Sequence, residues 1–266
     1  MPDIPETNKA LGQHWLHDAM ALDDIVGSAE VGPTDTVLEI GPGLGTLTAV
    51  LCRAAKQVVA VEFDAKLAAA LPKRLSATNL QIITQDILRF DFSQLPADYK
   101  IVANIPYYLT SNLIRVIGET SNPPIVAVLL VQREVAERVT AEPGAMSILS
   151  VTAQYYWQVD SGNIVPANMF TPPPKVDSQI LILERRNEPL FPAVDTKTFF
   201  RLVKAGFAQR RKTLLNSLSA GLQLSREETT GLCQRASIDP SRRAQSLDLQ
   251  EWYALYLASG QSVINT

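Results

Sequence analysis

The sequence predicts an α/β fold with a mainly parallel sheet, followed by a small all-α domain. Apolar, β-branched runs alternate with helix-like segments from about residue 20 to residue 140, and this alternation stops near residue 187. Repeated strand–helix units favour parallel strands with helices on both faces of the sheet. The length of 266 residues, with 46% hydrophobic and 19% charged residues, suits a soluble globular protein with a large core.

Seven β segments and five helices are expected in the first part of the chain. The predicted parallel strands are residues 36–40, 57–62, 80–84, 99–103 and 125–131. Two longer β segments, residues 148–159 and 177–184, are expected to pair antiparallel at the sheet edge. The predicted helices are residues 18–31, 45–55, 64–76, 109–120 and 133–140, and Asp64 is a plausible N-cap.

The C-terminal part has the composition of a separate helical domain. Residues 187–192 contain two prolines and predict a linker. Beyond them we expect helices at residues 198–208, 210–221, 226–236 and 250–257. The sequence thus predicts one domain over residues 1–186 and a second over residues 187–266.

Charge is distributed unevenly along the chain. The formal net charge is −3, which does not by itself indicate a nucleic-acid-binding protein. Residues 185–212, however, contain eight basic and two acidic residues, a local charge of +6. A polyanion could be bound by this segment while the rest of the surface stays acidic.

Several classes of protein are disfavoured. The longest apolar runs are far too short to span a membrane, and the N-terminus lacks the order of a signal peptide, so we expect a cytoplasmic protein. Cys52 and Cys233 have no metal-binding spacing and are expected to be free thiols. His14 and His17 would need further ligands to hold a metal, and we expect none.

Polar and glycine residues follow four of the predicted strands. The first strand leads into Gly41-Pro42-Gly43-Leu44-Gly45, where the backbone can approach a ligand closely. Thr46 stands where a dinucleotide fingerprint requires glycine, which argues against NAD. Glu62 ends the second strand and could accept hydrogen bonds from the hydroxyls of a ribose, and Asp86 follows the third strand and could accept one from an adenine amine. Each could alone be a cap or loop residue, but together with Asn104 they are expected to converge on one crevice.

Asn104-Ile105-Pro106-Tyr107 directly follows the fourth predicted strand. It supplies an amide oxygen, a backbone carbonyl held by a proline, and an aromatic face. These groups suit a planar ring with an exocyclic amine. The tetrapeptide resembles the N-[IL]-P-Y signature of methyltransferases that act on adenine amines.

Three further motifs narrow the resemblance to one family. Residues 11–18 (LGQHWLHD), 170–178 (FTPPPKVDS) and 207–214 (FAQRRKTL) resemble the F-G-Q-N-F-L-x-D, F-x-P-x-P-K-V-D-S and F-x-Q-R-R-K-T-L motifs of rRNA adenine dimethyltransferases. The similarity extends from about residue 8 to residue 257, and the last motif is typical of the branch that modifies 16S rRNA.

This resemblance implies a Rossmann-like class I methyltransferase domain and S-adenosylmethionine as the methyl donor. It implies dimethylation of two adjacent adenosines near the 3′ end of 16S rRNA in the maturing 30S subunit, by a monomer that needs neither metal nor membrane. By motif position, the cofactor-binding residues would be His14, Leu16, Gly41, Glu62, Asp86 and Asn104. The adenine site would contain Asn104, Pro106 and Tyr107, with Phe170 as a second ring, and Arg210, Arg211 and Lys212 would contact rRNA.

The chain departs from the family pattern at two places. His14 replaces the usual Asn, and Leu11 and Trp15 replace Phe. The segment after Gly144 is shorter than usual and lacks a Lys and a Tyr. Three alternatives stay open: a resistance methyltransferase of the 23S rRNA type, a non-catalytic assembly factor with the same fold, and a DNA adenine methyltransferase.

Overall fold

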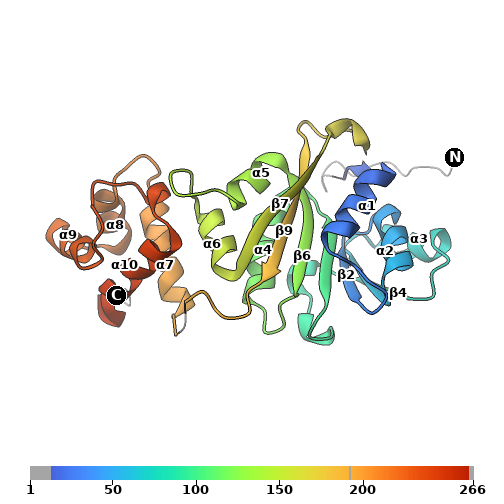
Figure 1. Ribbon diagram of the computed structural model, residues 1–266, viewed down its shortest axis with the longest axis horizontal. Coiled ribbons are helices and arrows are strands. Elements are labelled where there is room, and N and C mark those ends of the chain that lie inside the picture. The colour runs from blue at the N-terminus through green and yellow to red at the C-terminus, as the bar shows by residue number, and fades with distance from the viewer. Residues whose placement is uncertain (1–12, 192, 264–266) are drawn as a thin grey trace. The chain divides into compact units, whose positions relative to one another are not determined.

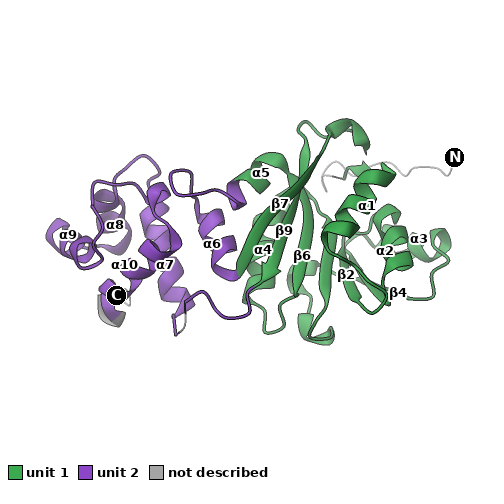
Figure 2. Cartoon of the chain, in the orientation of Figure 1, with its two compact units in different colours: residues 1–137, 157–185 green, residues 138–156, 186–266 purple. Residues whose placement is uncertain are grey.

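The computed structural model describes residues 13–191 and 193–263 and divides into two compact units (Figures 1 and 2). The first unit contains the chain up to residue 137 together with residues 157–185. The second contains residues 138–156 and the chain from residue 186 onward. The sequence predicted a domain boundary between residues 186 and 187. The longer segment of the second unit begins at Arg186, and the unit also includes residues 138–156.

A seven-stranded sheet forms the centre of the first unit, in the order β4-β3-β2-β5-β6-β9-β7 (Figure 1). The five strands from β4 to β6 are parallel, and β9 runs antiparallel to both β6 and β7. The strands are β2 (Thr36–Ile40), β3 (Gln57–Glu62), β4 (Leu80–Thr84), β5 (Lys100–Asn104), β6 (Val126–Gln132), β7 (Trp157–Val165) and β9 (Ser178–Arg185). The predicted α/β fold with a seven-stranded sheet is therefore confirmed.

Helices precede, connect and follow the parallel strands. They are α1 (Ala19–Ser28), α2 (Thr46–Ala54), α3 (Ala65–Arg74) and α4 (Thr110–Glu119), with α5 (Arg133–Val139) at the division between the units, and the 3₁₀ turns η2 (Ile87–Arg89), η3 (Phe92–Gln94), η4 (Tyr107–Leu109) and η5 (Ala167–Met169). Asp64 caps α3, because its Oδ1 accepts hydrogen bonds from the amides of Lys66 and Leu67. Side chains of α1 and α2 pack with Val37, Val58, Val102 and Val128 in one buried cluster.

A short second sheet was not predicted. β1 (Trp15–Leu16) pairs antiparallel with β8 (Phe170–Thr171), so that Leu16 lies opposite Phe170. This pairing ties the N-terminal motif to the proline-rich motif. Leu11 and Gly12, the first two residues of the N-terminal motif, lie outside the described residues.

The prediction of a strand over residues 148–159 was wrong for most of that segment. Residues Ile148–Tyr156 form helix α6, and β7 begins only at Trp157. Trp157 pairs with Arg185, the last residue of β9, so the partner strand has no residue left to pair with the preceding segment. Val151 of α6 instead packs in the core of the second unit. Packing thus overrode the strand preference of a segment rich in β-branched residues.

The second unit is a helical bundle around one apolar cluster. Besides α6 it contains α7 (Thr196–Phe207), α8 (Leu214–Leu222), α9 (Arg226–Arg235), the 3₁₀ turn η6 (Ala244–Ser246) and α10 (Leu249–Val263). The prediction that a helix starts at Arg210 was wrong. α8 starts at Leu214, because the Leu214 and Leu215 amides donate to the carbonyls of Arg242 and Pro240, and residues before it form a turn closed by Lys212 N–H to Gln209.

Among the described residues, no helix combines the length and apolarity needed to cross a membrane.

The helical core gives a test of packing at two glycines. A Cβ atom at Gly206 would lie 2.4 Å from the ring of buried Trp252, so Gly206→Ala should lower the free energy of unfolding by about 1–3 kcal/mol through overpacking. The matched control is Gly231→Ala in α9, where the nearest atom is 3.4 Å away and the gain in helix propensity should stabilise the protein by about 0.5–1 kcal/mol. Urea unfolding measures both, and a Gly206→Ala protein as stable as the wild type would contradict the packing.

Candidate active site

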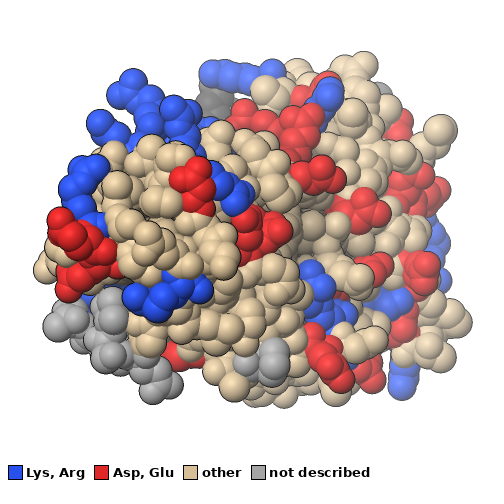
Figure 3. All heavy atoms as spheres, turned by 60° about the vertical axis from the view of Figure 1, so that its left-hand side comes forward, with Lys and Arg blue, Asp and Glu red and all other residues tan. Residues whose placement is uncertain are grey.

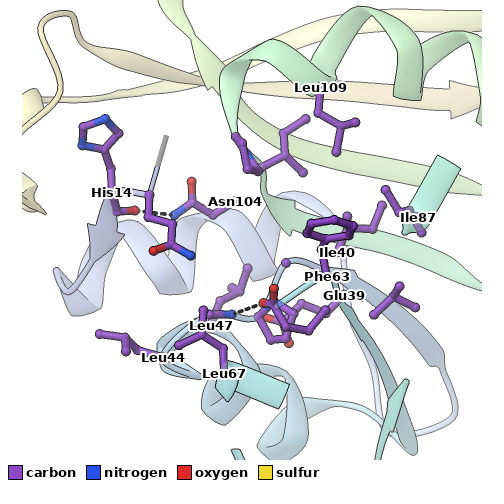
Figure 4. Close-up of a pocket in the computed structure, with 18 of the residues that line it drawn as sticks. His14, Glu39, Ile40, Leu44, Leu47, Phe63, Leu67, Ile87, Asn104 and Leu109 are labelled. Carbon is purple, nitrogen blue, oxygen red and sulfur yellow. Dashed lines mark hydrogen bonds between the residues drawn. The ribbon is translucent and has the colours of Figure 1, made fainter. Parts of the chain in front are cut away.

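One pocket of about 250 Å³ lies at the carboxyl ends of the central strands (Figure 4). The order β4-β3-β2-β5 places neighbouring strand ends side by side, as expected for a ligand site in an open α/β sheet. The pocket lining includes all but one of the residues predicted for cofactor and adenine binding: His14, Leu16, Gly41, Glu62, Asp86, Asn104, Pro106 and Tyr107. The exception is Phe170.

Glu62 holds the pocket floor together. It ends β3 and is only 6% exposed. Its Oε2 accepts a hydrogen bond from the Gly43 amide at 3.1 Å, and its Oε1 accepts one from the Asp64 amide at 2.9 Å. Burial raises the pKa of this carboxyl above its usual value, while the bonds from Asp64 and Gly43 oppose the rise. Each oxygen retains a lone pair for a ligand hydroxyl.

The glycine loop is shaped for close approach by a ligand. Gly41 has φ +68°, and a Cβ atom there would meet nothing within 4 Å, so the backbone borders open space in the pocket. Gly43 has φ +56°, and a Cβ atom there would lie 2.4 Å from the ring of Trp15. Trp15, which replaces Phe in the N-terminal motif, therefore packs directly against the loop. Glycine is needed at Gly43 both for the left-handed backbone and for this contact.

Glu39 is a pocket residue that the sequence analysis did not assign. It lies in β2, one residue before the strand ends, and is 1% exposed. Its Oε2 accepts no hydrogen bond from any described residue. Burial raises the pKa of the Glu39 carboxyl to about 8; the Thr48 hydroxyl opposes this and the negative charge of Glu62 adds to it. Its place beside the glycine motif was the available signal.

The pocket has a strongly acidic character. Glu39, Glu62 and Asp86 line it, and no Lys or Arg is found among its described lining residues. Asp86 also caps η2, its Oδ1 accepting from the Leu88 amide at 3.0 Å. A ligand with phosphates would find no cationic partner there, whereas a cationic nucleoside would find three carboxyl groups.

Asn104 ends β5 and faces the N-terminal segment. Its Nδ2 donates a long hydrogen bond of 3.5 Å to the carbonyl of His14 (Figure 4). With the amide nitrogen directed to that carbonyl, Oδ1 is the side-chain atom available to accept a proton from a ligand.

Tyr107 is held in place by the 170–178 motif. Its hydroxyl is 2.9 Å from Oγ of Ser178, the buried last residue of the 170–178 motif. Burial raises the Tyr107 pKa, so the phenol stays neutral. Pro106 precedes it, and the Pro106 carbonyl accepts from the Leu109 amide at 3.0 Å, which closes the turn of η4 and leaves one lone pair on that oxygen.

The ring beside Tyr107 is that of His14. The two ring centroids are 6.1 Å apart and the planes are inclined by 23°. His14 Nδ1 lies 2.7 Å from the carbonyl oxygen of Pro172, so this nitrogen carries the proton and donates. The predicted second ring, Phe170, is 3% exposed, packs in the core opposite Leu16 and does not line the pocket. The structure therefore does not bring Phe170 to the predicted adenine site.

Two exposed aromatic residues at the pocket were also missed. Phe63 directly follows Glu62 and is 64% exposed, and Tyr108 follows Tyr107 and is 67% exposed. Their position next to the assigned residues Glu62 and Tyr107 was the signal available in the sequence.

The predicted rRNA contacts lie in the second unit. Arg210, Arg211 and Lys212 are all exposed in the turn between α7 and α8. In the 170–178 motif, Asp177 Oδ1 accepts from the Ala167 amide at 2.9 Å and so fixes that loop. Within residues 13–191 and 193–263, no three His, Cys, Asp or Glu side chains form a group that could hold a metal.

The buried carboxyl of Glu39 makes stability dependent on pH. Its folded-state pKa of about 8 lies above the ordinary 4.5, so the folded protein keeps a proton that the unfolded chain loses in between. Stability is therefore lost as pH rises from about 4.5 to about 8. Glu39→Gln, which cannot ionise, should raise the Tm of the ligand-free protein more at pH 8 than at pH 5.

Thermal unfolding at both pH values measures this difference. Glu142→Gln is the control, because Glu142 is exposed and should give the same small effect at each pH. An equal Tm difference for Glu39→Gln at pH 5 and pH 8 would contradict the assignment.

Comparison with known proteins points to one family. The model of the family "Ribosomal RNA adenine dimethylase" matches residues 4–257. Ribosomal RNA small subunit methyltransferase A of Dehalococcoides mccartyi is 42% identical over 253 residues, covering 94% of this chain and 87% of that protein. Its namesake in Clostridioides difficile is 37% identical, covering 97% and 91%.

Two solved structures share the fold. A dimethyladenosine transferase from Plasmodium falciparum superposes with a TM-score of 0.78 at 27% identity, covering 94% of this chain and 99% of that one. The 23S rRNA methyltransferase ErmE gives a TM-score of 0.73 at 28% identity, covering 93% and 100%. With the family model matching nearly the whole length, this chain belongs to the ribosomal RNA adenine dimethylase family.

Proposed function

We propose that this protein uses S-adenosylmethionine to dimethylate N6 of two adjacent adenosines near the 3′ end of 16S rRNA in the maturing 30S subunit. The observation that carries the proposal is one pocket that is lined by Glu39, Glu62 and Asp86 together with Asn104 and Tyr107. The curated relatives named for the small ribosomal subunit support 16S rRNA over 23S rRNA. A subunit-modifying enzyme would act in the cytoplasm, and we expect it to work as a monomer.

The pocket residues fit this cofactor. Glu62, with a lone pair left on each oxygen, would accept hydrogen bonds from the ribose hydroxyls, and Asp86 would accept a hydrogen bond from the adenine amine. The unpartnered Oε2 of Glu39 would form a hydrogen bond with the ammonium group of the amino acid part, and the exposed Phe63 would offer a face for the adenine. His14, Leu16 and Gly41 complete the lining. When bound, S-adenosylmethionine supplies an electrophilic methyl group on a sulfonium centre.

The adenine site would act by positioning the target amine. The adenine N6 lone pair is delocalised into the ring and is a poor nucleophile. Asn104 Oδ1 and the remaining lone pair of the Pro106 carbonyl would each accept one N6–H, directing the nitrogen lone pair toward the methyl group. Transfer of the methyl group from the sulfonium sulfur to N6 would leave the amine cationic, and the amine would then lose a proton to water.

Tyr107 would stack on the target base. Its ring is fixed by the Ser178 contact, so it can hold a base taken out of its helix without losing further freedom. Such stacking contributes about 1–3 kcal/mol per base. His14 is the ring that lies next to Tyr107, and we infer that it supplies the second aromatic wall that the sequence analysis assigned to Phe170.

Replacement of Asn104 tests the mechanism. Asn104→Ala should lower kcat for methyl transfer to undermodified 30S subunits about 100-fold or more, because an acceptor that orients the amine is lost. Transfer is measured with labelled S-adenosylmethionine. Asn163→Ala, which removes an exposed Asn outside the pocket, should transfer at the wild-type rate. Wild-type transfer by Asn104→Ala would refute the role.

The exposed turn between α7 and α8 is proposed to contact rRNA phosphates. Changing Arg210, Arg211 and Lys212 to Gln should weaken binding to 30S subunits and reduce the slope of log affinity against log salt by about 2. The control replaces three exposed basic residues of the first unit, Arg53, Lys73 and Arg74, and removes the same charge. An unchanged salt slope in the turn variant would favour a merely solvated turn.

A further inference from the structure

One face of α7 carries three cationic side chains. Lys197, Arg201 and Lys204 are exposed and follow one another at i, i+4 and i+7, which places them on the same side of the helix. α7 has no acidic residue between Thr196 and Phe207. Figure 3 shows Lys and Arg side chains gathered at the upper left of the face that it draws.

These cations line an open hollow of about 390 Å³ in the second unit. Its other lining residues are small: Ala205 and Ala208 at the end of α7, and Gly221 in α8. A Cβ atom at Gly221 would lie 2.7 Å from the Cα of Ala205, so the two helices cross in direct contact. We call this hollow, with its six lining residues, the α7 groove.

The groove is lined by the three cationic side chains and otherwise only by alanine and glycine. Asp195, the acidic residue that precedes α7, is already engaged as the N-cap, because its Oδ1 accepts from the Lys197 amide and its Oδ2 from the Thr198 hydroxyl. Like charges at i, i+4 spacing disfavour a helix. A bound ligand that carries repeated negative charge would offset this repulsion.

We propose that the α7 groove binds one strand of the phosphodiester backbone of the rRNA substrate, an inference that rests on the function proposed above. The helix rise separates the three cations by about 6 Å and about 4.5 Å along the axis. Such a row can contact successive phosphates of one strand. Phosphate contacts fix register without reading sequence, so the groove would position the subunit and take no part in the methyl transfer.

The groove differs from the predicted contact at Arg210, Arg211 and Lys212. Those residues lie in the turn after α7, whereas the groove lies along the helix and includes Gly221 of α8. The row from Lys197 to Lys204 leads toward that turn, so one RNA strand could follow both.

The test replaces Lys197, Arg201 and Lys204 by Gln in the full-length protein. The control replaces Lys56, Lys73 and Arg74, three exposed residues of the first unit with the same composition and charge. Binding to undermodified 30S subunits is measured over a series of KCl concentrations. We expect the groove variant to bind at least 10-fold more weakly at low salt and its salt slope to fall by about 2.

Three further measurements separate this inference from its alternatives. Cofactor affinity by calorimetry and the Tm should match those of the wild type, and kcat at saturating subunit should be unchanged. Affinity and slope equal to those of the control would overturn the groove, as would weaker binding with an unchanged slope. Failure of the wild type itself to methylate 30S subunits would instead refute the proposed function.

Discussion

The site depends on the two hydrogen bonds that the buried carboxylate of Glu62 accepts from the backbone. One fixes the glycine loop at Gly43, and the other fixes the start of α3 at Asp64. The last residue of β3 thereby sets the distance between two segments that must both face a ligand. Trp15 packs against the same glycine, so the N-terminal segment is positioned by this loop as well. Loss of the carboxylate would release three segments of the pocket at once.

The second constraint is the contact between two motifs that are far apart in sequence. The Tyr107 hydroxyl meets Ser178, and the β1–β8 pairing holds the N-terminal segment against the 170–178 motif. The His14 carbonyl then accepts from Asn104, and the His14 ring faces Tyr107. The proposed adenine site is thus built from three sequence motifs. His14, which stands where the family has Asn, places an aromatic ring beside Tyr107.

Strand positions were predicted closely, because buried parallel strands are short apolar runs bounded by turn residues. β2, β3 and β4 have the predicted bounds, and four predicted pocket positions lie at or just beyond strand ends. Residues 148–156 were mistaken for a strand because the β-branched residues Ile148, Val151 and Thr152 favour extended structure locally. The segment is a helix because β9 ends at Arg185 and offers no further pairing, and because Val151 packs in the apolar core of the second unit.

The fold class followed from local composition alone. The family and the candidate site residues followed from motifs that are contiguous in the chain. Three features became visible only in the folded protein. Phe170 is buried, His14 lies beside Tyr107, and Glu39 lies at the pocket with an unpartnered oxygen. These contacts join residues that are far apart in the chain, as the ring contact between His14 and Tyr107 and the pairing of Leu16 with Phe170 show. No local pattern carries that information, because it arises only when distant segments pack.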